Sequence, residues 1–357
     1  MRDAAYTARQ LWIMHISRFI RARFRLWKIH DAGAGSPFLA SSPIQQLMRH
    51  GQLLRLCLRH CTELRYGKEA GACRIRKINT GDGTPQNPTN VSRGIYGATV
   101  GIDRLLKLWE KYNIRATWFT PAHTIESFPK QMAKVRDAGH EIGLHGYTHE
   151  YPSGLSAQQQ YDVLEKSIDV LTRFTGSRPL GYTAPAWLAS KELIPQLEHF
   201  GILYDHSFMH HDVQPYYVPD SSHTWIETDH AKEASHWMLP MTKLRPSQVV
   251  EIPANWHLDD WPPLQPKLGS ASGYVDTAVV EKLWKEQFDF AYREYDSFIF
   301  PISIHPQVSG KPQVILMHER LIEYINKHEG VEWMTFGQMA NEFREGAIAG
   351  VDIEGGV

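Results

Sequence analysis

From residue 95 onward, stretches with apolar residues at helical spacing alternate with short, continuously apolar stretches. Residues 101–112 are of the first kind, and their apolar side chains share one helical stripe: Ile102, Leu105, Leu106, Leu108 and Trp109. Asn113 ends this predicted helix, and the apolar run 116–119 (ATWF) predicts the strand that follows it. The pattern therefore predicts a helix–strand unit.

The same unit repeats along the chain. Helices are predicted at 128–138, 156–175, 190–200, 275–295 and 312–328, with a last short one near the C-terminus. Strands are predicted at 140–146, 181–184, 202–207, 249–256, 298–305 and 331–336. This alternation predicts a parallel sheet with covering helices, and seven strands after residue 115 suit a barrel better than an open sheet. Functional residues of such barrels lie at the C-terminal ends of the strands.

Composition divides the chain near residue 77. The first 77 residues hold 15 Lys and Arg but only 4 Asp and Glu, so their net charge is +11, whereas the remainder carries −12. Cys57, Cys61 and Cys73 all lie in this basic segment, and the remainder has no cysteine for disulfides or thiolate metal sites. Cys57 and Cys61 have no second pair, so we expect no zinc there. We expect a poorly ordered N-terminal segment at 1–77, a domain at 78–345 and a tail at 346–357.

The first 30 residues are rich in Arg and carry apolar residues at helical spacing. Three interpretations fit: a mitochondrial transit peptide, a basic helix on anionic lipid or nucleic acid, or a segment with no evolved role. No run of about 18 apolar residues indicates a membrane span. We expect a cytoplasmic protein that binds no nucleic acid, or a mitochondrial one if residues 1–30 are a genuine transit peptide.

The segment GHEIGLHGYTH at 139–149 is the most informative in the chain. His145 and His149 are four residues apart just beyond a predicted strand. This spacing puts two imidazoles on one face of a helical turn, which suits two nitrogen ligands of a divalent metal. Gly146 allows the backbone to turn sharply between strand and loop. The alternative is a pair of exposed loop histidines.

A third histidine, His305, ends the late predicted strand 298–305 and would face the same mouth of the barrel. Its unperturbed pKa lies near neutrality, so its natural role is that of a general acid or base. The alternative is a histidine that Pro306 holds in place without a chemical role.

Carboxylates and aromatic residues follow other predicted strands. In EIPANWHLDDWPP (251–263), Asp260 can orient a catalytic imidazole, and Trp261 can stack on a sugar ring. Trp187 could line the pocket and Asp205 could hold a neighbouring polar group. The alternative for Asp260 and its neighbours is a solvated loop, and the alternative for the aromatic residues is simple core packing.

Six segments carry a family resemblance: ATWF, HEIGLHGYTHE, GYTAPAW, YDHS, EIPANWHLDDWPP and IHP. In this order and spacing they resemble the polysaccharide deacetylases, also called the NodB-homology family. The similarity is greatest to the cyclic-imidase-like and peptidoglycan-deacetylase branch. The resemblance covers about residues 78–343, and its specificity lies in the combination of the motifs.

The resemblance implies a distorted (β/α)7 TIM-like barrel with one divalent cation, usually Zn²⁺, and a metal-bound water that attacks an amide carbonyl. By the family pattern, His145 and His149 match the metal ligands, and His305 matches the acid that protonates the leaving amine. Asp260 and Trp261 resemble, more loosely, the pair that orients this acid and lines the pocket.

Two departures from the family pattern stand out. Thr183-Ala-Pro185 stands where many members carry an arginine that orients the base. The family's first strand also ends in an Asp pair that supplies the base and a third ligand, but residues 73–78 contain no acid. Asp82, the nearest carboxylate, falls in a loop of Gly, Pro and Asn. We therefore expect a barrel that lacks its first strand.

These observations favour a hydrolase of carbon–nitrogen bonds other than peptide bonds, which removes acetyl from an amino sugar. Two alternatives stay open: a small cyclic-amide hydrolase, and an impaired relative that serves as a carbohydrate-binding or structural module. The expected partner is thus a carbohydrate or small amide, and the aromatic residues leave a homo-oligomer possible.

Overall fold

A single, mostly parallel sheet runs through the part of the chain that the computed structural model describes, which is residues 53–61, 88–220, 226–241, 243–266 and 273–353. These residues lie in one unit, Gly51–Val357. The strands are β1 (Leu53–Cys61), β2 (Thr117–Thr120), β3 (Glu141–Leu144), β4 (Gly181–Tyr182), β5 (Tyr204–Asp205), β6 (Tyr216–Pro219), β7 (Pro246–Glu251), β8 (Ser297–Ile304) and β9 (Val331–Trp333). Their order is β6-β7-β5-β4-β3-β2-β1-β8, with β9 paired to β1, and only the β6–β7 pair is antiparallel.

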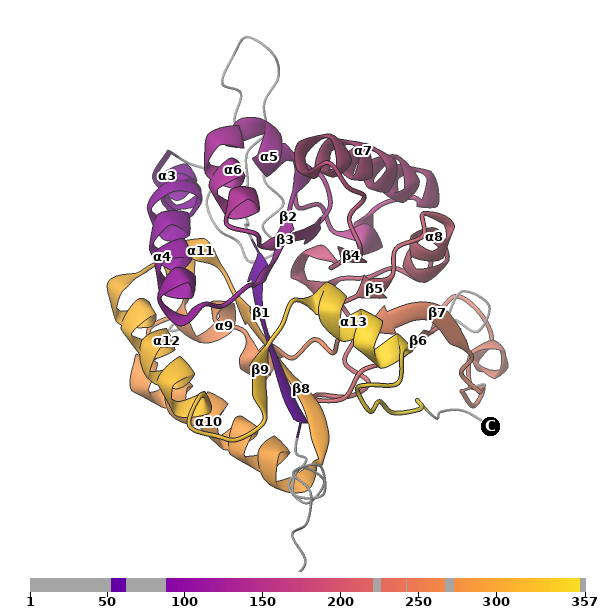
Figure 1. The fold of residues 1–357 in the computed structure, drawn as a ribbon. Helices are drawn as coiled ribbons and strands as arrows, with labels where there is room; N and C mark the ends of the chain where they lie inside the picture. The colour runs from indigo at the N-terminus through magenta and orange to yellow at the C-terminus, as the bar shows by residue number, and fades with distance from the viewer. Residues whose placement is uncertain (1–52, 62–87, 221–225, 242, 267–272, 354–357) are drawn as a thin grey trace, which may run out of the picture. The chain divides into compact units, whose positions relative to one another are not determined.

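Helices surround this sheet (Figure 1). They are α3 (Pro88–Tyr96), α4 (Ile102–Tyr112), α5 (Ala122–Ser127), α6 (Pro129–Asp137), α7 (Ala157–Thr175), α8 (Leu193–His199), α9 (Trp261–Leu264), α10 (Thr277–Glu294), α11 (Pro306–Ser309), α12 (Pro312–Ile325) and α13 (Phe336–Arg344). The predicted helices and the seven predicted strands are present with shifted ends. The antiparallel strand β6 was not predicted.

The apolar core has two layers. The larger layer joins helices to the outer face of the sheet, as Trp109 of α4 and Trp284 of α10 illustrate. The smaller layer joins residues of distant strands to α13, among them Phe119 of β2, Ile299 of β8 and Phe336. Because side chains from strands far apart in the sheet order meet there, the sheet is curved around this inner cluster.

The α/β architecture is confirmed, and the sheet does not close into a complete barrel. Among the described residues, β7 and β8 are not paired along their length. A single parallel bridge between Asp259 and Ser303 lies in that interval.

The expectation that the first strand is missing is wrong. β1 lies between β2 and β8, and His60 is level with Trp118 on one side and Ile304 on the other. The sequence of β1, LLRLCLRHC, has the period of two that is typical of a strand. Its Arg content concealed this pattern, because the segment 1–77 had been set apart by charge.

The correction also changes two smaller points. Cys57 and Cys61 both lie in β1, where four residues of a strand span roughly 13 Å. Residues 1–30, residues 73–78 and Asp82 lie outside the described residues, so the expectations for them stay predictions. None of the described helices combines the length and apolarity that a membrane span requires.

The turn that follows β8 is held by a close backbone contact. A π-helical turn, Gly97–Gly101, leads into α4 and packs against α11. A Cβ atom on Gly101 would lie 2.3 Å from the carbonyl oxygen of Pro306. Glycine is therefore required there for α4 to support the segment that begins at His305.

We expect Gly101→Ala to lower the free energy of unfolding by about 1–3 kcal/mol, because the added methyl group must displace backbone atoms. Denaturant unfolding measures this difference. Gly154→Ala is the matched control, since a Cβ atom there meets nothing within 4 Å, and it should change stability by less than about 0.5 kcal/mol. Equal effects of the two substitutions would contradict the requirement at Gly101.

Candidate functional site

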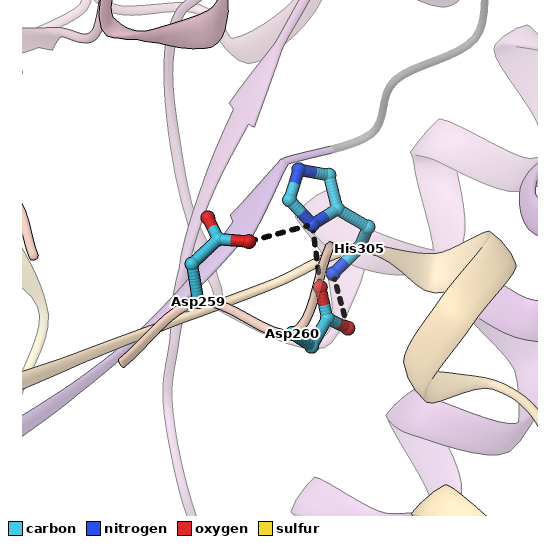
Figure 2. Close-up of side chains that lie close together, drawn as sticks. All are labelled: Asp259, Asp260 and His305. Carbon is cyan, nitrogen blue, oxygen red and sulfur yellow. Dashed lines mark hydrogen bonds and ion pairs between the residues drawn. The ribbon is translucent and has the colours of Figure 1, made fainter. Parts of the chain in front are cut away.

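A buried imidazole–carboxylate pair lies at the C-terminal end of β8. His305 Nδ1 is 2.6 Å from Asp260 Oδ1, and the His305 backbone N–H donates to Asp260 Oδ2 at 3.0 Å. Both side chains are buried. Figure 2 shows the other ring nitrogen of His305 on the side away from both carboxylates. The carboxylate therefore holds His305 at two points, the ring and the backbone N–H.

The local fold explains how Asp260 reaches His305. The backbone bridge between Asp259 and Ser303 continues with a hydrogen bond from Asp260 N to the Ser303 carbonyl at 3.1 Å. The segment after β7 thus runs beside the end of β8. Asp259 Oδ1 accepts from Trp261 N at 2.7 Å and lies 3.9 Å from His305 Nδ1.

The three side chains of Asp259, Asp260 and His305 are close enough to suggest a metal site. Their ligand atoms all lie within 4.8 Å of one another, and no other group of three such residues occurs among those described. However, His305 Nδ1 and Asp260 Oδ1 are bonded to each other at 2.6 Å. This arrangement is typical of an acid–base dyad, in which the carboxylate holds the imidazole in one tautomer.

One of the two predicted tryptophans, Trp261, lies against this dyad, and the other, Trp187, packs against other aromatic rings. The half-buried ring of Trp261 is 5.0 Å from that of His305. Trp187 packs against Trp256 at 4.4 Å and against His206 at 5.6 Å. Ala186 and Trp187 both have a φ of 53°, a strained left-handed conformation for side chains of this kind. Such strain is stored at functional sites when the surrounding structure enforces it.

His145 and His149 lie in the loop that leaves β3, and this loop is not the helical turn that the spacing suggested. Gly146 turns at φ 68°, as expected, and His149 also has a left-handed φ of 71°. The Glu150 carboxylate holds the loop, because it accepts from Tyr147 N at 2.7 Å and from Thr148 N at 2.6 Å. Both histidines are buried, which excludes exposed loop histidines.

The two imidazoles fit a cation site in their chemistry. Their ring centroids are 4.8 Å apart at an interplanar angle of 75°. His145 Nδ1 donates to the Thr183 carbonyl at 2.7 Å, so its lone pair is on Nε2. A second ring nitrogen tied to a backbone carbonyl is typical of metal-ligating histidines. Among the described residues, no acidic side chain or cysteine completes a set of three with them.

Comparisons with known proteins decide the family. The family model described as polysaccharide deacetylase matches residues 96–204. A protein named peptidoglycan deacetylase from Helicobacter pylori is 47% identical over 263 residues, which are 73% of this chain and 89% of that protein. A peptidoglycan deacetylase-like protein of Gibberella zeae is 37% identical over 277 residues, 74% of this chain and 82% of the relative. The chain belongs to the polysaccharide deacetylase family.

Solved structures agree with this fold. A putative polysaccharide deacetylase from Mycobacterium smegmatis superposes with a TM-score of 0.67 at 23% identity, and the match covers 90% of this chain and 98% of that one. A probable polysaccharide deacetylase from Pseudomonas aeruginosa gives 0.64 at 21% identity, over 83% and 92% of the two chains. The predicted family is confirmed, and the chain is a hydrolase of carbon–nitrogen bonds other than peptide bonds.

In this deacetylase, Asp205 lies in an internal carboxyl pair with Glu251. The two residues are level with each other at the ends of β5 and β7, and both are completely buried. Glu251 Oε1 accepts from the backbone N–H groups of Ser207 and Phe208 at 2.8 and 2.9 Å. Burial, and secondly the charge of Asp205, raises the pKa of Glu251 well above its usual value. Burial beside the Asp205 carboxyl thus favours the protonated form of Glu251.

The neighbouring polar group that Asp205 holds is the hydroxyl of Ser207. Ser207 Oγ donates to Asp205 Oδ1 at 2.9 Å and accepts from Ala184 N at 2.8 Å. Through these bonds the carboxyl pair supports the start of the turn that carries Trp187. The substrate-binding role assigned to Asp205 stays a prediction.

Sequence reasoning passed over four polar residues of this region: Glu150, His206, Glu251 and Asp259. His206 Nδ1 donates to the Ile252 carbonyl at 2.5 Å, and its ring stacks on Phe119. Three of them are next in the sequence to the candidates His149, Asp205 and Asp260, and Glu251 begins the segment 251–263, so proximity in the sequence was a signal. Residue type alone did not separate them from loop residues.

We expect Glu251→Gln to remove a pH dependence of stability. Because the folded-state pKa of Glu251 is raised, the unfolded chain loses this proton first as pH rises, so the stabilising contribution declines above the usual carboxyl range. The wild type should therefore lose stability relative to Glu251→Gln as pH rises above the usual carboxyl range. Denaturant unfolding at a series of pH values measures the difference, and parallel curves for the two proteins would contradict a raised pKa of Glu251.

Proposed function

We propose that this hydrolase removes the acetyl group from N-acetylated amino sugars of peptidoglycan and requires one divalent cation, which the histidine ligands indicate to be Zn²⁺. The observation that carries the proposal is the buried His305–Asp260 hydrogen bond of 2.6 Å. Relatives at 47% and 37% identity bear names that refer to peptidoglycan deacetylation, which supports this substrate.

His305 has the geometry of a general acid. Its Nδ1–H donates to the Asp260 carboxylate, so Nε2 is the nitrogen that can carry a second proton toward substrate. When the amide C–N bond breaks, the departing nitrogen takes this proton and leaves as a neutral amine. The Asp260 carboxylate stabilises the imidazolium before the transfer, as in other carboxylate–histidine pairs.

His145 and His149 are the described residues that would hold the cation. When bound, such a cation polarises the amide carbonyl and lowers the pKa of a coordinated water. The Thr183 carbonyl fixes the ring of His145, and Glu150 holds the loop between the two histidines. These bonds fix the ring of His145 and the backbone of the loop that carries His149, which reduces the cost of binding the cation.

Trp261 and Trp187 would shape the sugar site. The ring of Trp261 lies against His305, so a sugar or acetyl group that stacks on it is brought to the acid. The half-buried indole also excludes water from the ring nitrogen that carries the proton. Trp187 extends the aromatic surface through its edge-on contact with the exposed ring of Trp256.

A second candidate is a catalytically impaired hydrolase of this family that serves as a carbohydrate-binding module. It is favoured by the two-histidine site, because catalytic zinc usually has three protein ligands. β1 occupies the expected position, but the first carboxylate after it in the sequence, Glu63, lies outside the described residues. Cation affinity separates the two candidates.

The test measures bound zinc by elemental analysis, acetate release from peptidoglycan fragments and N-acetylglucosamine oligomers, and ring opening of a small cyclic amide. We expect one bound cation and acetate release from the sugars, with loss on chelation and recovery on zinc addition. His145→Gln should lose both zinc and activity, whereas His199→Gln, an exposed histidine on α8, should keep both. Sugar binding without zinc or acetate release would support the module, and turnover of the cyclic amide alone would identify a different hydrolase.

We expect His305→Gln to lower kcat by about 10²- to 10⁴-fold, because the proton donor to the amine is removed. Asp260→Asn should lower kcat by at least about tenfold, since an amide favours the wrong imidazole tautomer. Zinc content should stay unchanged in both variants. Loss of zinc from either one would show instead that the dyad ligates the cation.

A further inference from the structure

The hydrogen bonding of Asp260 continues beyond the dyad into the helical layer. Ser309 Oγ of α11 lies 2.5 Å from Asp260 Oδ2, and His318 Nε2 of α12 lies 2.8 Å from the same hydroxyl oxygen. All the side chains in this chain of contacts are buried. A continuous path of hydrogen bonds therefore runs from His305 through Asp260 and Ser309 to His318.

The donors in this path can be assigned by counting protons. The Asp260 carboxylate only accepts, so the single hydroxyl proton of Ser309 points to it. The Ser309 oxygen must then accept from His318, whose proton is on Nε2. Asp260 Oδ2 thus receives two donors, Ser309 Oγ–H and His305 N–H, while Oδ1 faces the ring of His305.

His318 is suited to be a neutral donor. Its ring lies 5.9 Å from that of Trp284 and 6.5 Å from that of Trp109. Burial lowers its pKa to about 4, although the charge of Asp260 acts in the opposite direction. The titratable groups that these contacts join are Asp259, Asp260, His305 and His318. A neutral His318 adds no charge that would compete with His305 for Asp260.

We propose that Ser309 and His318 are positioning residues that hold the Asp260 carboxylate in the orientation in which Oδ1 serves His305. A carboxylate bonded at one oxygen alone can rotate about its Cβ–Cγ bond, and the two donors on Oδ2 prevent this rotation. Neither residue touches substrate. The effect on catalysis rests on the proposed function, whereas the effect on the His305–Asp260 bond does not.

The test compares Ser309→Ala with two variants of His318 that differ in one donor. His318→Gln keeps an N–H donor, and His318→Leu has a similar volume without one. Ser309→Ala should lower kcat on the order of tenfold with KM unchanged, the size of effect seen when groups behind a catalytic residue are removed. His318→Leu should lower kcat less, in the same direction, and His318→Gln should restore most of it.

A second measurement needs no substrate. The proton between His305 Nδ1 and Asp260 Oδ1 should give a proton NMR signal far downfield of the amide region, because the bond is short and charge-assisted. This signal should move or broaden in Ser309→Ala and His318→Leu and stay in place in His318→Gln. If the wild type proves inactive, the proposed function fails, but this signal still tests the positioning role.

Two controls separate positioning from general stability. Ser167→Ala removes a buried serine of α7, and His140→Gln removes a half-buried histidine whose pKa is also lowered to about 4; neither belongs to this path. Both should leave kcat and the downfield signal unchanged. The proposal is overturned if Ser309→Ala keeps wild-type kcat and signal. If Ser309→Ala does not fold, equal behaviour of His318→Gln and His318→Leu overturns it.

Discussion

The buried carboxylate of Asp260 is the constraint on which the functional end of this sheet depends. A carboxylate without access to water must receive several donors, and Asp260 receives them from His305, from the His305 backbone and from Ser309. These donors belong to the end of β8 and to α11, whereas Asp260 itself follows β7. Satisfying one side chain therefore joins the two strands between which the sheet is not paired.

A partly buried carboxylate joins elements in a similar way at the N-terminal ends of the strands. Glu141 at the start of β3 accepts from Thr117 Oγ1, from Tyr204 OH and from the backbone of Gly337. This carboxylate thereby holds the first turn of α13 against β2 and β5. Since α13 carries Phe336 into the inner cluster, a polar contact at one end of the sheet secures the apolar packing within it.

Backbone strain is concentrated in the loops that carry the candidate site. His149, Ala186 and Trp187 are three of the four non-glycine residues with positive φ among those described. Each is held by neighbours: Glu150 fixes the histidine loop, and Ser207 with the Asp205–Glu251 pair fixes the start of the other turn. Such loops are rigid before substrate arrives, which favours catalysis because less order has to be created on binding.

The sequence by itself determined the alternation of helices and strands, the family and the identity of His145, His149, His305 and Asp260 as candidates. These features follow from local periodicity and short motifs, which a chain displays without folding. It did not reveal β1, because strand pairing joins Leu53–Cys61 to residues far away in the chain and charge had set that segment apart. Only the tertiary structure placed Ser309 and His318 behind Asp260 and paired Asp205 with Glu251. Hydrogen bonds and pKa shifts between distant residues depend on burial and on distances of a few ångströms, and the local order of residues determines neither.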